Sequence, residues 1–291
     1  MNIKGLSSFW ILVSIMCCAC AQHKAPHLDR DSVTLVDAQW QSDSLREGLV
    51  LKTHHFRNKT YMASNQYIAY LEVSKAAAQS IAFIHNDSLT TTSKQATHAH
   101  AHAAINGTYF DMDKGNPICY LRINGKEIGE NTPGKDTIHR KYYQYASLVL
   151  DSNNLLSFCI PDSGRFAERD WDEPNVMTAG PMLIISNKIL PQRQDRTFVT
   201  VRHNRTALGC RADGTIILFT VDGRTKQSEG MTLHEVAKTL HYLGCVNAIN
   251  LDGGGSTTLW TNKYGIVNHP SDNGRFDKAG ERPVSSCILI K

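Results

Sequence analysis

The chain has 291 residues, a formal net charge of +4 and 41% hydrophobic residues. This length and composition are typical of one large globular domain, with or without a smaller N-terminal layer, and they supply ample material for a hydrophobic core. The charge is mild and no basic run is interleaved with aromatic residues, so we expect no nucleic-acid partner.

The first twenty residues have the pattern of a targeting segment. Lys4 supplies positive charge, Phe9 to Met16 form an apolar core too short to span a bilayer, and Cys17-Cys18-Ala19-Cys20 follow. This pattern resembles a bacterial lipoprotein signal over residues 1–19, with Cys20 as the lipidated residue. Cys18 as the lipidated residue, and an ordinary secretory signal, stay open as alternatives. We therefore expect a protein anchored by lipid in the bacterial cell envelope, at the periplasmic face or the cell surface.

Residues 20–46 are polar and lack sustained periodicity. We interpret them as a tether, with a short helix around Val33 to Trp40, that leads into one domain over residues 47–291. No other stretch is long and apolar enough to cross a membrane.

Five cysteines remain if Cys20 carries the lipid, and an odd number leaves at least one thiol free. No pair has the spacing of zinc ligands, and no activating group stands next to any of them. We expect neither a complete disulfide framework nor a catalytic thiol. The five are Cys119, Cys159, Cys210, Cys245 and Cys287.

The first half of the domain shows strand patterns. Leu49 to Phe56 and Tyr67 to Val73 alternate apolar and polar residues, which predicts half-buried strands. Residues 76–86 fit either a strand or a short helix. His98, His100 and His102 would share one face of a strand, where they could form a metal cluster, but not of a helix.

The middle of the chain predicts hairpins. Ile123 to Lys126 has the residues of a tight turn, and residues 142–150 pair with 155–160 as antiparallel strands. Trp171 lies in an acidic and aromatic loop, where it either stacks on a sugar or covers the core. Ala179-Gly180-Pro181 predicts a rigid turn before a strand over residues 182–186.

A strand, a helix and a second strand then follow one another. The strand Thr215 to Val221 ends at Asp222, and the strand Cys245 to Leu251 ends at Asp252. Between them, Thr232 and Glu235 have the spacing of a helix capping box. Such a unit usually connects parallel strands by a right-handed crossover, so both carboxylates should emerge at one edge of the sheet.

A hairpin brings a basic residue to the same edge. The turn Arg211 to Gly214 joins the strand that starts near Arg205-Thr206 to the strand that ends at Val221. Counting back from the turn places Arg205 roughly opposite Asp222. A guanidinium should therefore lie near the two carboxylates.

Three glycines follow Asp252 directly. Gly253, Gly254 and Gly255 can take positive φ and direct successive N–H groups toward an anion, and Ser256 adds a hydroxyl. A plain tight turn between two core strands is the alternative, although such a turn needs fewer glycines.

Seven stretches, in this order, carry a resemblance to a known family. The chain resembles the phosphodiester glycosidase domain, typified by the lysosomal uncovering enzyme that removes N-acetylglucosamine from its phosphodiester on mannose. One departure is Asn204, where the family pattern suggests proline. The stretches cover about residues 100–290: Ala104 to Asp111, Thr178 to Leu183, Arg202 to Gly209, Val221 to Arg224, Asn250 to Ser256, Val267 to Asp272 and Glu281 to Val284.

The resemblance implies roles for further residues. It places a helix end near His98 to His102, which favours exposed histidines over a metal cluster. It favours Asn106 as a ligand of a sugar hydroxyl or acetamido group over a plain turn residue. Arg282 becomes a second candidate phosphate ligand, with a surface ion pair as the alternative. The substrate-binding set also includes Thr206, Arg224, Asn268 and Asp272.

These elements together predict an α+β fold of mixed, largely antiparallel sheets with a strand–helix–strand crossover near the C-terminus and flanking helices. We expect a hydrolase that cleaves a sugar-1-phosphodiester on a phosphorylated glycan or cell-envelope polysaccharide. Asp252 would act as base or nucleophile, Asp222 would orient it or share that role, and Arg205 and Arg282 would bind phosphate.

Several alternatives stay open at this point. Water could attack carbon or phosphorus, and a divalent cation, Mg²⁺ or Ca²⁺, could bind Asp222 and Asp252. A metal-dependent phosphodiesterase and a non-catalytic glycan-binding lipoprotein are the two competing hypotheses. The Gly-rich and charged loop over residues 273–280 could act as a lid.

Overall fold

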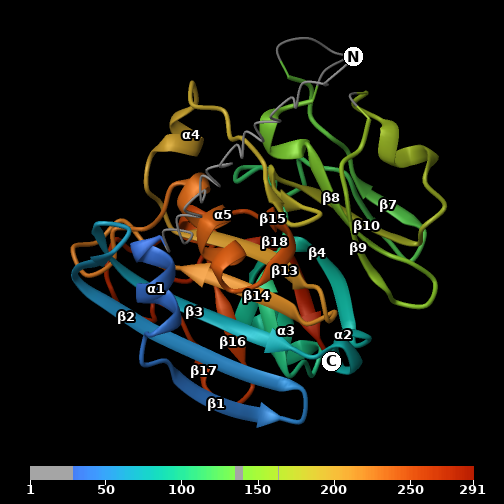
Figure 1. Cartoon of the computed structure of the whole chain (residues 1–291). Coiled ribbons are helices and arrows are strands. Elements are labelled where there is room, and N and C mark those ends of the chain that lie inside the picture. The colour runs from blue at the N-terminus through green and yellow to red at the C-terminus, as the bar shows by residue number, and fades with distance from the viewer. Residues whose placement is uncertain (1–28, 135–139, 163) are drawn as a thin grey trace, which may run out of the picture.

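The computed structural model describes residues 29–134, 140–162 and 164–291, and its chain folds around three antiparallel sheets (Figure 1). The largest sheet has eight strands. Their order across the sheet is β1 (Gln41–Arg46), β2 (Leu49–Tyr61), β3 (Ser64–Val73), β14 (Ile216–Val221), β13 (Arg205–Arg211), β15 (Cys245–Asn250), β11 (Met182–Ile185) and β12 (Lys188–Ile189).

Two five-stranded sheets pack against it. One has the order β7 (Lys126–Gly129), β6 (Leu121–Ile123), β10 (Asn175–Ala179), β8 (Ala146–Leu150) and β9 (Leu156–Cys159). The other has the order β17 (Gly265–Ile266), β16 (Leu259–Thr261), β5 (Ala103–Asn106), β18 (Pro283–Ile290) and β4 (Ile81–Thr91).

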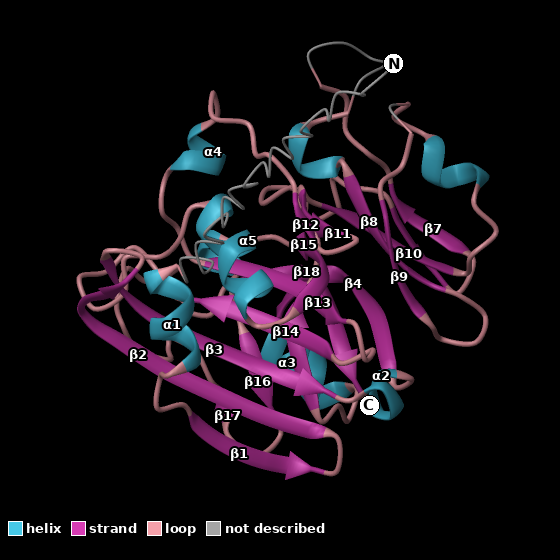
Figure 2. Ribbon diagram, viewed as in Figure 1, coloured by secondary structure: helices cyan, strands magenta, loops and turns pink. Residues whose placement is uncertain are grey.

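The helices are short and lie around the sheets (Figure 2). The α-helices are α1 (Arg30–Val36), α2 (Lys75–Ala78), α3 (Thr92–His98), α4 (Thr197–Thr200) and α5 (Leu233–Tyr242). Single 3₁₀ turns occur at η1 (Tyr142–Gln144), η2 (Ala167–Asp170) and η3 (Gly254–Ser256). This composition confirms the predicted α+β fold with largely antiparallel sheets.

The central core lies where the three sheets meet. Leu71 and Leu218 come from the large sheet, Leu148 from the β8 sheet and Ile105 and Ile288 from the β5 sheet, and all five are buried in one cluster. The opposite face of the large sheet is covered by α1 and α5, whose apolar residues form a second cluster. Burial on both faces makes the large sheet the rigid layer that positions the site.

The predicted crossover is present, with one strand between its two ends. Both β14 and β15 pair antiparallel with β13, so β14 and β15 are parallel to each other and α5 connects them. Arg205 lies opposite Val221, one residue from its predicted partner, and Ala207 lies opposite Asn250. The residues that follow β14 and β15 therefore emerge at one edge, beside the start of β13.

Helix α5 forms as its sequence predicts. Thr232 accepts from the main-chain N–H of Glu235, and the Glu235 carboxylate accepts from the N–H of Thr232, which completes the capping box. Val236, Ala237 and Leu240 on one face are buried against the sheet. Gly244, with φ of 87°, lets the chain leave the helix and enter β15.

The domain begins earlier than residue 47. The expected tether over residues 20–46 overlaps α1 and β1, and β1 pairs with β2 from Gln41↔Thr53 onward. The Asp29 carboxylate accepts from Lys238 Nζ at 2.6 Å, which ties the start of α1 to α5. Residues 29–46 therefore belong to the fold, while the predicted signal, Cys20 and the rest of the tether lie outside the described residues.

The structure decides several open sequence interpretations. Residues 76–86 contain both a helix end and a strand, in α2 and β4. Helix α3 ends at His98, so the three histidines do not share a strand face. Trp171 packs on the cluster of Tyr120, Val149 and Val176 and therefore covers the core.

The five cysteines in the described ranges are all unpaired. Within residues 29–134, 140–162 and 164–291, none of the helices is long and apolar enough to cross a membrane.

Candidate active site

The predicted site residues converge at the edge where β14 and β15 end. Asp222 follows β14, Asp252 follows β15, and β13 begins between them at Arg205. The third sheet meets this edge, because the Asn106 side chain at the end of β5 donates to the Asp252 carbonyl at 2.7 Å. Segments distant in the sequence thus form one site.

Asp252 is the partly exposed carboxylate of this site. Burial of its carboxyl raises the pKa of Asp252 to about 6, even though the Ser256 hydroxyl and the Arg282 and Arg224 guanidinium groups lower it. Ser256 Oγ is buried and makes no hydrogen bond of ordinary geometry within the described chain, so it acts on the carboxylate as a nearby dipole. A carboxyl with this pKa can exchange a proton near neutral pH.

Asn106 contacts the main chain of Asp252, and Thr206 contacts Asn106. Asn106 Oδ1 accepts from Thr206 Oγ1 at 2.9 Å and from the Thr258 N–H at 3.1 Å. Its Nδ2 donates to the Asp252 carbonyl, and both side chains are fully buried. These internal contacts favour a structural role that holds Asp252 in place, while substrate binding by Asn106 and Thr206 stays a prediction.

Asp222 and the segment that follows β17 form a second network. The Asp222 carboxylate accepts from Asn268 Nδ2 at 2.9 Å, from the His269 main-chain N–H at 2.9 and 3.0 Å, and from His269 Nδ1 at 2.8 Å. Asn268 is buried, donates also to the Thr257 carbonyl and accepts from the Leu259 N–H, which favours a structural role, and its binding of substrate stays a prediction. Asp222 is likewise 1% exposed.

These contacts favour an orienting role for Asp222. Burial raises the pKa of Asp222, and its bonds to His269 and Asn268 lower it. That Asp222 orients Asp252 or shares its role as base or nucleophile stays a prediction. The Asp222 carboxylate binds Nδ1 of His269 and so fixes the orientation of the imidazole ring, with Nε2 pointing away from Asp222.

His269 is held between aromatic rings. Phe276 stacks on its ring with centroids 3.8 Å apart and an interplanar angle of 18°, and Tyr67 meets it edge-on at 4.6 Å. Phe276 comes from the loop expected to act as a lid, so this loop lies over His269. The His269 side chain remains 17% exposed.

The glycine loop is shaped by two arginines. A Cβ at position 254 would lie 2.8 Å from Arg224 Nη2, and one at position 255 would collide with Arg282 and Asp272. Gly254 has φ of 61°, whereas Gly253 has φ of −120°. Gly254 and Gly255 thus let the two guanidinium groups lie directly on the loop, while a Cβ at position 253 would lie 2.8 Å from the Asn204 carbonyl oxygen.

The main-chain N–H groups of this loop do not all point toward a common anion site, as the glycines had suggested. The Gly254 N–H donates to the Asn204 carbonyl at 2.9 Å, and the Ser256 N–H donates to the Gly253 carbonyl at 3.2 Å. Positive charge for an anion comes instead from Arg224 and Arg282. Arg282 Nε also donates to Asp272 at 2.8 Å, so Asp272 orients Arg282 rather than binding substrate itself.

Arg205 is only 2% exposed. Its Nε donates to the Met231 carbonyl, and its Nη2 donates to the carbonyls of Phe198 and Val201, each at 2.8 Å. Two of its three nitrogens thus serve the fold, and burial lowers the pKa of Arg205 to about 10. Arg205 therefore ties α4 to the site edge, and Arg224 and Arg282 are better placed for phosphate.

The residues of the site do not fit a divalent cation bound by Asp222 and Asp252. N–H donors already occupy both oxygens of Asp222, and guanidinium groups flank Asp252. Across the residues that the structure describes, no group of three or more His, Cys, Asp or Glu side chains is arranged to hold a metal ion. We therefore derive no step through a metal.

Sequence reasoning missed the role of His269. The residue lies in a stretch that carries the family resemblance, but no spacing rule links it to Asp222, which is 47 positions away. Only the meeting of the third sheet with the end of β14 brings the two together. The signal available in the sequence was a histidine next to an asparagine, Asn268, within such a stretch.

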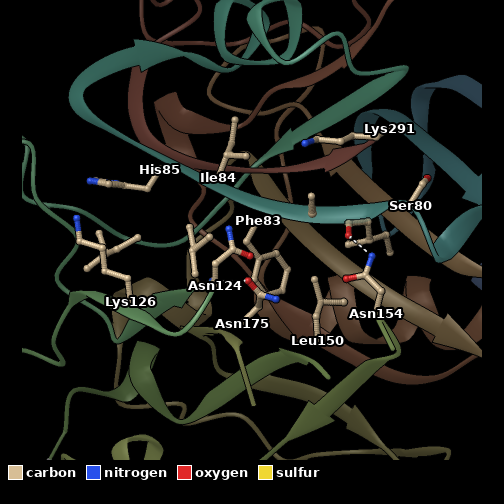
Figure 3. Close-up of a pocket in the computed structure, with 14 residues that line it drawn as sticks. Ser80, Phe83, Ile84, His85, Asn124, Lys126, Leu150, Asn154, Asn175 and Lys291 are labelled. Atoms are coloured by element: carbon tan, nitrogen blue, oxygen red, sulfur yellow. Dashed lines mark hydrogen bonds between the residues drawn. The ribbon is translucent and has the colours of Figure 1, made fainter. Parts of the chain in front are cut away.

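One cavity lies away from this site. It has a volume of about 590 Å³ and is bounded by β4 and the β6–β7 hairpin, with Phe83, Asn124 and Lys126 among its lining residues (Figure 3). Asn154 at its side donates to the carbonyls of Gln79 and Ile81 and so serves the fold. None of the site residues described above lines this cavity.

Comparison with known proteins finds relatives that match part of this chain. The mouse N-acetylglucosamine-1-phosphodiester alpha-N-acetylglucosaminidase is 47% identical over 94 residues, which is 32% of this chain and 18% of that protein. The SPbeta prophage-derived uncharacterized protein YomE of Bacillus subtilis is 44% identical over 75 residues, or 25% of this chain and 11% of that protein. The chain thus spans less than a fifth of the length of either relative.

Solved structures share the fold. The zebrafish N-acetylglucosamine-1-phosphodiester alpha-N-acetylglucosaminidase catalytic domain, described as auto-inhibited by its pro-peptide, superposes with a TM-score of 0.65 at 22% identity over 87% of each chain. A hypothetical protein from Synechocystis gives a TM-score of 0.60 at 15% identity, over 86% of this chain and 63% of that one. At these identities the likeness concerns the fold alone.

The model of the phosphodiester glycosidase family matches residues 99–291. This range contains Asp222, Arg224, Asp252, His269 and Arg282. The chain therefore belongs to the phosphodiester glycosidase family.

Proposed function

We propose that the protein is a hydrolase that cleaves the bond between the anomeric carbon of a sugar and the phosphate of a sugar-1-phosphodiester. One observation carries this proposal: Asp252, with its pKa raised to about 6, stands beside a glycine loop on which Arg224 and Arg282 lie. This arrangement offers a proton-exchanging carboxylate next to a binding place for a phosphodiester.

The two arginines hold the phosphate. A guanidinium group meets phosphate oxygens through two parallel N–H bonds, and the loop lacks the Cβ atoms that would keep the substrate away from the backbone. Arg282 is oriented by Asp272, while Arg224 makes no hydrogen bond to a side chain within the described residues. The substrate phosphate is the anion that both guanidinium groups bind.

Asp252 acts on the attacking water. In this scheme the water oxygen bonds to the anomeric carbon, Asp252 accepts the water proton, and the bond to the phosphate oxygen breaks with its electron pair. The leaving phosphate is a weak base and needs little acid assistance. His269, whose Nδ1–H is held by Asp222, directs Nε2 toward the substrate, where this nitrogen accepts a hydrogen bond from a sugar hydroxyl.

The family and its relatives support the proposed substrate class. The mouse relative is named for hydrolysis of an N-acetylglucosamine-1-phosphodiester, which supports N-acetylglucosamine as the sugar to test first. We propose a phosphorylated glycan or cell-envelope polysaccharide as the natural substrate.

The test measures N-acetylglucosamine released from UDP-N-acetylglucosamine by the purified full-length chain, with Asp252→Asn beside it and with and without EDTA. The proposal predicts turnover that the substitution abolishes and EDTA leaves unchanged. Loss of activity in EDTA and recovery with added metal would favour a metal-dependent phosphodiesterase. A folded protein without turnover on any sugar-1-phosphodiester would favour a glycan-binding lipoprotein.

We also propose that the protein is anchored by lipid at Cys20 in the cell envelope. The apolar segment followed by Cys17-Cys18-Ala19-Cys20 supports this location. Metabolic labelling with a radioactive fatty acid should mark the wild type and Cys18→Ser but not Cys20→Ser. Labelling lost in Cys18→Ser alone would move the anchor to Cys18.

A further inference from the structure

A large cavity lies on the other side of Asp252 from His269. It has a volume of about 1050 Å³ and lies between η1, which precedes β8, and the segment from β11 to α4. Its lining includes Lys141, Tyr142, Tyr143, Arg193, Arg196 and Phe198. Pro181 and Met182 at its wall belong to one of the stretches that carry the family resemblance.

The topology places this cavity at the same sheet edge as the candidate active site. Met182, which lines the cavity, starts β11 opposite Ile249 of β15, and the Pro181 carbonyl accepts from the Asn250 N–H at 3.1 Å. Asp252 follows Asn250 by two residues. Across the sheet, the order β14, β13, β15, β11 therefore places Asp222 and His269 on one side of Asp252 and the cavity on the other.

Direct contacts join the two sites. The Phe198 ring lies 5.4 Å from the Arg205 guanidinium and 6.3 Å from the Tyr109 ring. The Tyr109 hydroxyl donates to the carbonyls of Gly180 and Leu251, each at 3.0 Å. The Phe198 and Tyr109 rings thus connect the cavity to the main chain that carries Asp252.

The lining has the chemistry of a site for an acidic carbohydrate. Aromatic rings such as Tyr142, Tyr143 and Phe198 provide flat apolar faces for sugar rings. Among the described residues that line it, four carry a positive charge and none is a carboxylate. These four are Arg140, Lys141, Arg193 and Arg196.

These positive charges are only partly neutralised. The buried Glu168 pairs with Arg140, and Asp195 alone serves both Arg193, at 2.8 Å, and Arg196, at 3.6 Å. Lys141 Nζ lies 5.8 Å from the centroid of the Tyr143 ring. The rim formed by Lys141, Arg193 and Arg196 therefore keeps a net positive charge that attracts an anion.

We propose that this cavity is a subsite for an acidic oligosaccharide that extends the substrate beyond the scissile phosphodiester. The inference rests on the proposed function for the placement of the substrate. The volume, at the upper end of the range of about 300–1,000 Å³ for small-molecule sites, leaves room for more than one sugar ring. Aromatic faces supply contact, and the basic rim selects for charge.

The binding test uses an acidic trisaccharide that contains no phosphodiester. Isothermal titration calorimetry compares trigalacturonate with the neutral maltotriose on the full-length protein at low salt. We expect trigalacturonate to bind at least tenfold more tightly, with an affinity that falls as NaCl is added. Lys141→Gln and Arg196→Gln should each weaken this binding about threefold, the size of an exposed ion pair.

Lys126→Gln provides the matched control, because Lys126 is an exposed lysine that lines the distant cavity between β4 and the β6–β7 hairpin. It should leave the affinity for trigalacturonate unchanged. Equal binding of the two trisaccharides, no binding of either, or equal weakening by the control would overturn the inference.

This test and that of the proposed function can fail separately. Trigalacturonate binding that depends on Lys141 and Arg196, in a protein without turnover, would uphold the subsite and remove the hydrolase. Turnover of UDP-N-acetylglucosamine without trigalacturonate binding would uphold the hydrolase and overturn the subsite. Where both hold, trigalacturonate should inhibit the wild type at a concentration about threefold lower than for Arg196→Gln.

Discussion

Asp222 Oδ2 lies 2.8 Å from Nδ1 of His269, and the main-chain N–H of His269 donates to the same carboxylate. Two bonds from one residue to one buried carboxylate fix both the backbone and the ring. The pair joins the end of β14 to the segment after β17, which belong to different sheets. Asp222 is thus a positioning residue, and His269 is the group that it presents.

Asp222→Asn should lower kcat by about 10²–10⁴-fold, because an amide no longer fixes the Nδ1–H tautomer of His269. KM should change little, since Asp222 lies beneath the substrate. Steady-state kinetics across pH check this split, with circular dichroism as the control for folding. A variant that raises KM alone would contradict the positioning role.

Asp252 should control the dependence of activity on pH. Because burial raises the pKa of Asp252 to about 6 and the ionised form takes the water proton, kcat/KM should rise as the pH increases through about 6. Asp252→Glu should keep a shifted profile at reduced rate, while Asp252→Asn should be inactive at every pH. Activity that instead falls as the pH rises through 6 would assign Asp252 the role of an acid.

The raised pKa of Asp252 also predicts an effect of pH on the stability of the fold. The folded-state pKa of about 6 exceeds the ordinary value of 3.8, so the folded protein binds more protons between these values and loses stability as the pH rises through that window. Asp252→Asn removes this loss and should raise the free energy of unfolding at pH 7.5, on the order of 3 kcal/mol, but not at pH 3.5. Urea titrations at both values check this, and a gain of equal size at pH 3.5 would contradict it.

Arg224 and Arg282 should act on the substrate phosphate. Replacing either by Gln should lower kcat/KM by about 10–100-fold, the size of one charged hydrogen bond. Lys at either position should restore only part of the loss, because an ammonium group lacks the fork of a guanidinium. Lys226→Gln, close in sequence but without a contact to the glycine loop, is the control. A loss no larger than that of the control would remove the arginine from the phosphate site.

The Arg140–Glu168 pair should stabilise the β8 sheet. Arg140 Nη1 lies 2.7 Å from Glu168 Oε1, and both side chains are buried. Glu168→Gln leaves a buried guanidinium without its counter-charge and should cost about 3–5 kcal/mol in the free energy of unfolding. Denaturant unfolding checks this, with Glu127→Gln as the control, because Glu127 is an exposed partner of Arg122. Equal losses in the two variants would contradict the assigned role.

Much of this fold could be predicted from local pattern. Helix α5 carries its capping box and apolar face in the sequence, and the hairpin between β13 and β14 follows from its Gly-containing turn. The shared edge of Asp222 and Asp252 follows from these two elements. The position of β13 between β14 and β15 does not, since pairing between distant strands depends on the packing of the whole core.

The roles of single site residues were harder to predict. Asn106 and Asn268 have the side chains of sugar ligands, but both are buried and hydrogen-bonded to other parts of the chain, which favours a place in the scaffold. A sequence shows which groups can donate and accept, not which ones the fold has already satisfied. The link between Asp222 and His269, and the cavity beside Asp252, arise only where separate sheets meet.

The most direct test of the account is hydrolysis of UDP-N-acetylglucosamine in water enriched in oxygen-18, followed by mass spectrometry of the nucleotide product. Attack of water at the anomeric carbon predicts UDP without label, formed by the wild type and not by Asp252→Asn. Label in the UDP phosphate would show attack at phosphorus and would contradict the proposed glycosidase mechanism.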